Sequence, residues 1–183
     1  MRKRLFVAIL LDDKTKEKLE NYKNNLNLNQ KNNIQWIPKE NLHITIYFLE
    51  SIEEKLIPEI INKINQVISK TKPFSLKFEK IILAPPKKEP HMIWAQFEKN
   101  KNYDQLFFDL NNFLQKFLIK KTQINYKENI PHVTMARFKN KTKINDNDIK
   151  QINLPDLNIN CINLMESQLN VNGAIYSTIN TFF

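Results

Sequence analysis

The chain of 183 residues contains a single glycine, Gly173. Dinucleotide-binding loops, phosphate-binding P-loops and the nucleophile elbow of α/β-hydrolases each need two or more glycines, because their backbone turns tightly or approaches the ligand closely. The H-E-x-x-H pattern of zinc proteases is also missing from the sequence. These absences exclude most of the common nucleotide-binding and hydrolase motifs.

The hydrophobic pattern predicts an α+β chain. Runs rich in β-branched and aromatic residues are bounded by short polar turns, which is typical of strands in a mostly antiparallel sheet. The expected strands include Leu5–Leu11, Leu42–Leu49, Met92–Phe97, Pro131–Phe138 and Ala174–Phe182. Helical periodicity predicts helices over Lys14–Leu26, over Tyr103–Leu118 and after a capping box formed by Ser51 and Glu54. The two halves of the chain have a similar order of elements, so we expect one domain spanning 1–183 with two related lobes.

Charge and cysteine content constrain the partner and the compartment. The 28 basic and 19 acidic residues give a net charge of +9, which favours a polyanionic partner such as nucleic acid, although biased codon usage in a Lys-rich chain would produce the same count. The single cysteine, Cys161, cannot form an internal disulfide and fits a reducing compartment. The first apolar run lacks a cleavage site, and no run approaches the ~18 apolar residues of a membrane span. A cytoplasmic protein is expected.

Two of the three histidines lie in matched surroundings. The two segments are LHITI, residues 42–46, and PHVTM, residues 131–135. Because side chains alternate across a strand, His43 and Thr45 should project from one face while the apolar residues beside them point into the core. His132 and Thr134 should do the same. If the two strands lie side by side, two imidazoles and two hydroxyls meet in one cleft.

This set of side chains suits an in-line displacement at phosphorus. The reaction needs a base for the entering oxygen and an acid for the leaving oxygen, and imidazole, with a pKa of about 6.5, can serve as either at neutral pH. The hydroxyls of Thr45 and Thr134 can donate hydrogen bonds to the non-bridging oxygens. Two histidines without a carboxylate cluster make a poor metal site, so we expect no metal and no other cofactor. The third histidine, His91, has no threonine two residues later and is interpreted as a surface residue.

Several segments resemble, in order, the motif blocks of the two-histidine (2H) phosphoesterase superfamily, in particular the RNA 2′,3′-cyclic phosphodiesterases, also called 2′-5′ RNA ligases. The matching segments are Arg4–Ala8, Trp36–Pro38, Glu40–Ile46, Trp94, Pro131–Phe138, Glu166–Leu169 and Gly173–Tyr176. The resemblance covers nearly the whole chain. It implies a two-lobed, pseudo-symmetric α+β fold, with mostly antiparallel sheets flanked by helices around a central cleft. The family usually has glycine where this chain has Glu50.

The resemblance also implies roles for the matched residues. His132 is expected to be the proton acceptor that activates water, and His43 the proton donor to the leaving 3′-oxygen, so that an RNA end with a 2′-phosphate results. Thr45 and Thr134 are expected to bind the phosphate, with Arg137 adding positive charge. Arg137 lies at an odd offset from His132, so it reaches the same face only through a bulge or at the end of the strand.

Phe6 and Tyr47 are candidates for stacking a base, with ordinary packing in the core and the sheet as the competing interpretation. The expected partner is RNA with a 2′,3′-cyclic phosphate end. The protein is expected to act as a monomer, without binding a membrane or a metal. Two other hypotheses stay open at this point. The chain could act as a 2′-5′ RNA ligase or on a small cyclic nucleotide, or it could be a non-catalytic RNA-binding module that uses its basic surface.

Overall fold

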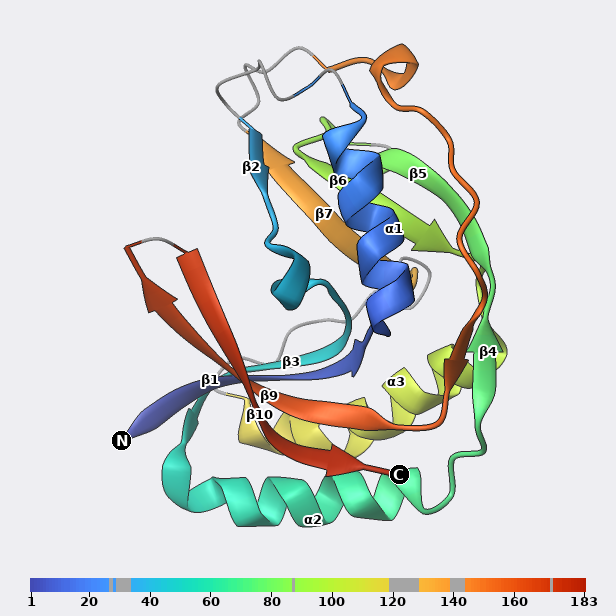
Figure 1. The fold of residues 1–183 in the computed structure, drawn as a ribbon. Coiled ribbons are helices and arrows are strands. Elements are labelled where there is room, and N and C mark those ends of the chain that lie inside the picture. The colour runs from blue at the N-terminus through green and yellow to red at the C-terminus, as the bar shows by residue number, and fades with distance from the viewer. Residues whose placement is uncertain (27, 29–33, 87, 119–128, 139–143, 172) are drawn as a thin grey trace.

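In the computed structural model, the main sheet is antiparallel and has eight strands, in the order β10-β9-β1-β3-β7-β6-β5 with β2 paired to β7 (Figure 1). The structure describes all residues except 27, 29–33, 87, 119–128, 139–143 and 172. The strands are β1 (Arg2–Leu10), β2 (Ile34–Trp36), β3 (His43–Glu53), β5 (Phe78–Ala84), β6 (Met92–Phe97), β7 (His132–Phe138), β9 (Ile162–Asn170) and β10 (Gly173–Phe182). The helices are α1 (Asp13–Asn24), α2 (Ile57–Ile68) and α3 (Lys101–Leu114). These elements confirm the predicted α+β class with antiparallel sheets.

The sheet consists of two halves that meet between β3 and β7. We call β10-β9-β1-β3 the first half-sheet and β7-β6-β5, with β2, the second half-sheet. Ile44 of β3 pairs with Val133 of β7 at the junction. Helices α2 and α3 pack together and against the first half-sheet, whereas α1 carries the chain from β1 to β2 of the second half-sheet. Two short strands, β4 (Phe74–Leu76) and β8 (Leu157–Ile159), form a separate sheet.

Helix α1 has a side-chain cap at its start, whereas the capping box predicted before α2 is not formed. Asp12 caps α1 by accepting a hydrogen bond from the backbone nitrogen of Thr15 at 2.7 Å. The predicted capping box at Ser51 and Glu54 is wrong, because β3 continues to Glu53 and Ser51 instead accepts a hydrogen bond from the Arg2 side chain. Helix α2 begins at Ile57 and has a proline in its first turn, where the missing N–H costs nothing.

Strands β3 and β7 each contain a β-bulge at the same distance from their histidine. In the first half-sheet, Thr45 pairs with Ala8 and Tyr47 with Val7, so that Ile46 is the extra residue. In the second half-sheet, the corresponding shift in the pairing of β7 with β6 makes Met135 the extra residue. A bulge reverses which face the following residues occupy.

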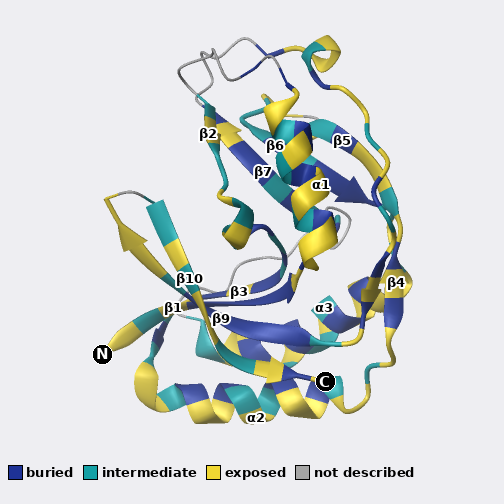
Figure 2. Cartoon of the chain, viewed as in Figure 1, coloured by how far each residue is buried: buried dark blue, intermediate teal, exposed yellow. Residues whose placement is uncertain are grey.

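The core lies on the side of the sheet opposite to the histidines. Figure 2 shows the central strands β1 and β3 as largely buried, and the tip of the β9–β10 hairpin as exposed. Ile44 and Val133, which stand between the motif residues, are both fully buried. The predicted hairpin signal at Asn172-Gly173 includes a residue outside the described part of the chain. Gly173 itself has a positive φ of 126°, which suits glycine.

Glu50 occupies the position at which the family resemblance predicted glycine. Its φ is 57°, in the left-handed region that a residue with a Cβ adopts at a cost. The pairing of β3 with β1 shifts again here, because Glu50 pairs with Leu5 whereas Phe48 pairs with Phe6. The backbone at position 50 therefore has the left-handed conformation that favours glycine, although the residue is Glu.

Candidate active site

The two motif strands are neighbours, and their histidines and threonines lie on one face of the sheet. Because Ile44 pairs with Val133 in an antiparallel register, His43 lies across from Thr134, and Thr45 lies across from His132. All four side chains are partly buried, while the residues between them are in the core. We call the side of the sheet that carries these four residues the histidine face. The structure thus brings together the two imidazoles and two hydroxyls.

Both imidazoles are held by the same backbone contact. Nδ1 of His43 lies 2.7 Å from the carbonyl oxygen of Asn41, and Nδ1 of His132 lies 2.8 Å from the carbonyl oxygen of Ile130. A carbonyl can only accept, so Nδ1 carries the proton in each ring and the lone pair of a neutral imidazole is on Nε2. In His43, Nε2 lies 2.9 Å from Oγ1 of Thr45. Each histidine can therefore exchange a proton through Nε2.

The bulges bring two further side chains to the histidine face. Arg137 follows the bulge at Met135 and is exposed. The sequence analysis predicted that Arg137 would reach this face only through a bulge or at the end of the strand. Its Nη1 lies 3.3 Å from Sδ of Met92, and its charge lowers the pKa of both His43 and His132. Arg137 therefore lies near both imidazoles.

Phe48 is the counterpart of Arg137 in the first half-sheet. Each residue stands five positions after its histidine and beyond a bulge. The Phe48 side chain is 62% exposed, and its ring lies 6.1 Å from that of Phe6. The sequence analysis did not select Phe48, because strict alternation assigns it to the core face. Only the matching of H-x-T-x-x-Phe with H-x-T-x-x-Arg could have indicated it.

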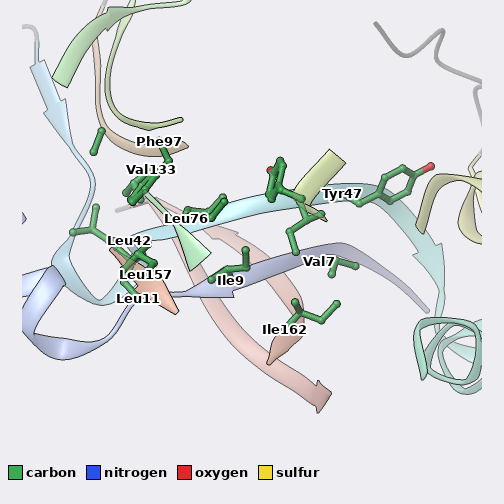
Figure 3. Packing of buried hydrophobic residues seen from close by; sticks show 14 of the residues in the cluster. Val7, Ile9, Leu11, Leu42, Tyr47, Leu76, Phe97, Val133, Leu157 and Ile162 are labelled. Carbon is green, nitrogen blue, oxygen red and sulfur yellow. The ribbon is translucent and has the colours of Figure 1, made fainter. Parts of the chain in front are cut away.

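Tyr47 does not occupy the position that its predicted base-stacking role requires. The bulge at Ile46 turns Tyr47 to the core face, where it pairs with Val7 and is buried (Figure 3). Its hydroxyl donates a hydrogen bond to Oδ1 of Asn111 in α3 at 3.1 Å. The stacking prediction for Tyr47 is therefore corrected to a packing role against α3.

Phe6 is on the histidine face but is covered by other rings. Its ring centroid lies 5.0 Å from that of His43 and 5.1 Å from that of Tyr176, and only 3% of the residue is exposed. Tyr176 also meets His43 edge-on at 5.2 Å. Phe6 therefore supports the ring of His43, and the aromatic surface available beside it belongs to Phe48.

The surroundings of His132 differ from those of His43. Trp94 of β6 stacks on His132, with ring centroids 3.6 Å apart and planes inclined by 18°. Burial is the main cause that lowers the pKa of His132 to about 4, and the nearby charges of His43 and Arg137 act in the same direction. Burial also lowers the pKa of His43, opposed by its backbone hydrogen bond. Both imidazoles are therefore neutral in the free protein at pH 7.

The described residues offer neither a metal cluster nor a membrane-spanning helix. No group of three or more His, Cys, Asp or Glu side chains is arranged to hold a metal ion in the described ranges. Among the helices described, none has the length and apolar character needed to cross a membrane.

Comparisons with known proteins agree with this fold. The model of the LigT-like phosphoesterase family matches residues 9–94. An RNA 2′,3′-cyclic phosphodiesterase of Methanocaldococcus jannaschii is 29% identical over 181 residues, which cover 96% of this chain and 98% of the relative. A solved structure from Thermus thermophilus superposes with a TM-score of 0.81 at 18% identity, covering 98% of this chain and 96% of the other. The apo form of E. coli LigT gives a TM-score of 0.73 at 15% identity, covering 99% and 96%.

The fold and the two motif strands resemble those expected of a 2H phosphoesterase. The chain is similar to the LigT-like phosphoesterases over residues 9–94 and to a protein named as a cyclic phosphodiesterase over nearly its whole length, which is consistent with an enzyme of the hydrolase class.

Proposed function

We propose that this enzyme is an RNA 2′,3′-cyclic phosphodiesterase that opens a terminal cyclic phosphate to a 2′-phosphate. The relative from M. jannaschii bears this name and is similar over nearly its whole length. The observation that carries the proposal is the pair of imidazoles on one face, each with Nδ1 bound to a carbonyl and Nε2 available for proton transfer. In-line displacement at phosphorus needs two such groups on opposite sides of the reacting atom.

In the proposed reaction, His132 is the base and His43 is the acid. Nε2 of His132 removes a proton from water as the water oxygen forms a bond to phosphorus. The bond between phosphorus and the 3′-oxygen breaks, and Nε2 of His43 donates its proton to that oxygen. The product keeps the phosphate on the 2′-oxygen. Proton exchange with solvent then returns His132 to the neutral form, and His43 takes up a proton again when the next substrate binds.

The protonation states required follow from the surroundings of each ring. The lowered pKa of His132 keeps it neutral, as a base must be. His43 must be protonated although burial lowers its pKa in the free enzyme. A bound phosphodiester carries a negative charge, and an opposite charge nearby favours the protonated form of an imidazole. Substrate binding therefore raises the pKa of His43 and prepares the acid.

The other residues of the histidine face would bind the phosphate and the nucleoside. Thr45 and Thr134 lie across from the two histidines and can donate hydrogen bonds to the non-bridging oxygens. Arg137 supplies the positive charge on this face. Because the leaving oxygen belongs to the ribose and is protonated by His43, the nucleoside would lie on the first half-sheet. Phe48 is the exposed aromatic side chain on that side.

The partner in this proposal is the end of an RNA chain, which the net charge of +9 would attract. The mechanism uses only side chains of the protein, so no metal or other cofactor takes part. We also propose a monomer that works in the cytoplasm, in keeping with the free thiol of Cys161.

The direct test is hydrolysis of an oligoribonucleotide that ends in a 2′,3′-cyclic phosphate, with a chelator present. We expect a product with a 2′-phosphate, identified by its resistance to a 3′-specific phosphatase. Activity lost on chelation, or a 3′-phosphate product, would contradict the proposal. Joining of the same oligonucleotide to a 5′-hydroxyl end at a higher rate than hydrolysis would identify a ligase. Binding without turnover, unchanged when both histidines are replaced, would identify an RNA-binding module.

A further inference from the structure

The two imidazoles share a backbone contact but differ in what touches their rings. His132 lies flat against the indole of Trp94, with centroids 3.6 Å apart and an angle of 18°. Among the described residues, the rings that contact His43 are tilted or edge-on: Phe6 at 5.0 Å and Tyr176 at 5.2 Å. One face of the His132 ring is therefore covered by a large flat surface, whereas the contacts of His43 are looser.

This difference arises at a single position of the shared register. The residue paired with the motif threonine is Ala8 for Thr45 and Trp94 for Thr134. On either side of this position the two half-sheets have the same pairing register, including the bulge one residue later. An indole in one half thus stands where the other half has a methyl group.

We propose that Trp94 is a positioning residue that fixes the imidazole of His132 and makes this histidine, rather than His43, the base of the reaction proposed above. Stacking at 3.6 Å leaves the ring little freedom to tilt, while the carbonyl of Ile130 fixes its rotation about the side-chain bonds. Together the two contacts aim Nε2 in one direction. A base held in this way needs no reorganisation when water and substrate arrive.

The indole also excludes water from one face of His132, and burial is the main cause of the lowered pKa of this ring. The titratable and charged groups that act on the pKa of His132 are His43 on β3 and Arg137 on β7, while Lys80 on β5 forms an ion pair with Glu79. Glu79 is held by Gln96, which pairs with His132. None of these groups is altered when Trp94 is replaced. A cation–π attraction between protonated His132 and the indole would raise the pKa of His132, whereas burial lowers it. The direction in which the pKa changes when Trp94 is replaced therefore shows which effect dominates.

The first experiment follows the titration of His132 by NMR in the free enzyme. The signal is assigned by its loss in His132→Gln. We expect Trp94→Ala to raise the pKa of His132 from about 4 towards its ordinary value, by one pH unit or more. Trp94→Phe should keep most of the shift, because it retains a flat ring and loses no hydrogen bond: Nε1 of Trp94 is buried without a partner within the described part of the chain. Phe6→Leu, on the other half-sheet, is the matched control and should leave His132 unchanged.

A pKa of His132 that stays the same or falls in Trp94→Ala would overturn the proposal. So would an equal shift in Phe6→Leu. This measurement needs no activity, so its result stands apart from the identity of the substrate. Failure of the wild-type enzyme to hydrolyse cyclic phosphates would contradict the proposed function alone.

The second experiment measures kcat/KM against pH on a substrate that ends in a cyclic phosphate. In Trp94→Ala the acidic limb should move to higher pH by the amount that the NMR titration shows, and Trp94→Phe should restore the wild-type position. A purely structural role would lower the rate by the same factor at every pH and leave the limb in place, which would contradict the proposal.

Discussion

Strands β3 and β7 share the same series of structural features but differ in the residues that surround them. Each has a histidine, a threonine two residues later, a bulge, and an outward side chain five residues after the histidine. Around His43 the neighbours are the aromatic rings of Phe6 and Tyr176, and the exposed ring of Phe48 lies beside Phe6. Around His132 they are the stacked Trp94 and the charged Arg137.

The comparison separates two tasks. The shared features supply one imidazole and one hydroxyl from each strand, and a displacement at phosphorus by acid–base catalysis needs an acid and a base of this kind. In the proposed reaction, the differing neighbours would give each half its own role: the buried, stacked ring and the positive charge suit the half that would activate water, and the aromatic surface suits the half that would receive the nucleoside. The two strands share their motif but differ in the side chains around it.

The largest expected effect tests the shared part. Replacement of either motif histidine, in His43→Ala or His132→Ala, should lower kcat by about 10²–10⁴, because each removes one proton transfer. The third histidine provides the control, since His91→Ala should retain full activity. Steady-state kinetics on the cyclic-phosphate oligonucleotide measures all three. Near wild-type activity in either motif variant would show that the two halves do not both act in the chemistry.

A smaller effect tests the charge on the second half-sheet. We expect Arg137→Gln to raise KM by about ten- to a hundredfold, since a charge-assisted hydrogen bond to phosphate contributes ~1.5–3 kcal/mol. The charge of Arg137 lowers the pKa of both imidazoles, so its removal should raise both and move the whole pH–rate curve to higher pH. Arg137→Lys keeps the charge and should keep the position of the curve. A curve that stays in place in Arg137→Gln would mean that the guanidinium does not act on these rings.

The counterpart on the first half-sheet is Phe48. Loss of its ring in Phe48→Ala should weaken binding of a nucleoside 2′-phosphate by about fivefold or more, since stacking on a base contributes ~1–3 kcal/mol. Binding of inorganic phosphate should not change. Phe108→Ala, on helix α3, removes an equally large and partly exposed ring and serves as the control. Calorimetric titration that shows equal losses for both ligands would contradict a contact with the base.

Part of this site could be predicted from the sequence, because strand alternation is a local rule. It placed His43 with Thr45 and His132 with Thr134, and it placed the residues between them in the core. The bulges could not be predicted in the same way. They depend on pairing with β1 and β6, strands that are distant in the chain, and they decide that Tyr47 turns inward. Strand pairing also explains why Ser51 does not cap a helix. Ser51 pairs with β1 and accepts a hydrogen bond from Arg2, so β3 continues past the position of the predicted cap.

The same dependence on pairing explains why the sequence could not distinguish the two histidines. Their local motifs are nearly identical, and the residues that differentiate them come from other strands: Ala8 from β1 and Trp94 from β6. Assignment of the acid and the base therefore came from family resemblance. The proposal that the stack of Trp94 on His132 selects the base would add a physical cause to that assignment.

The last expected effect concerns stability rather than activity and sharpens the comparison of the two rings. The pKa of His132 is about 4 in the folded protein and about 6.5 in an unfolded chain. Between these values the unfolded chain takes up a proton that the folded protein does not, so the free energy of unfolding should fall as pH falls from about 6.5 to about 4. His132→Gln should remove this contribution, about 2–3 kcal/mol at the acidic end at roughly 1.4 kcal/mol per pKa unit. His43→Gln should remove less, because the rings described next to His43, Phe6 and Tyr176, meet it tilted and edge-on rather than stacked. Urea titrations at a series of pH values measure the difference, and equal slopes for the two variants would mean that the stack on His132 does not set the halves apart.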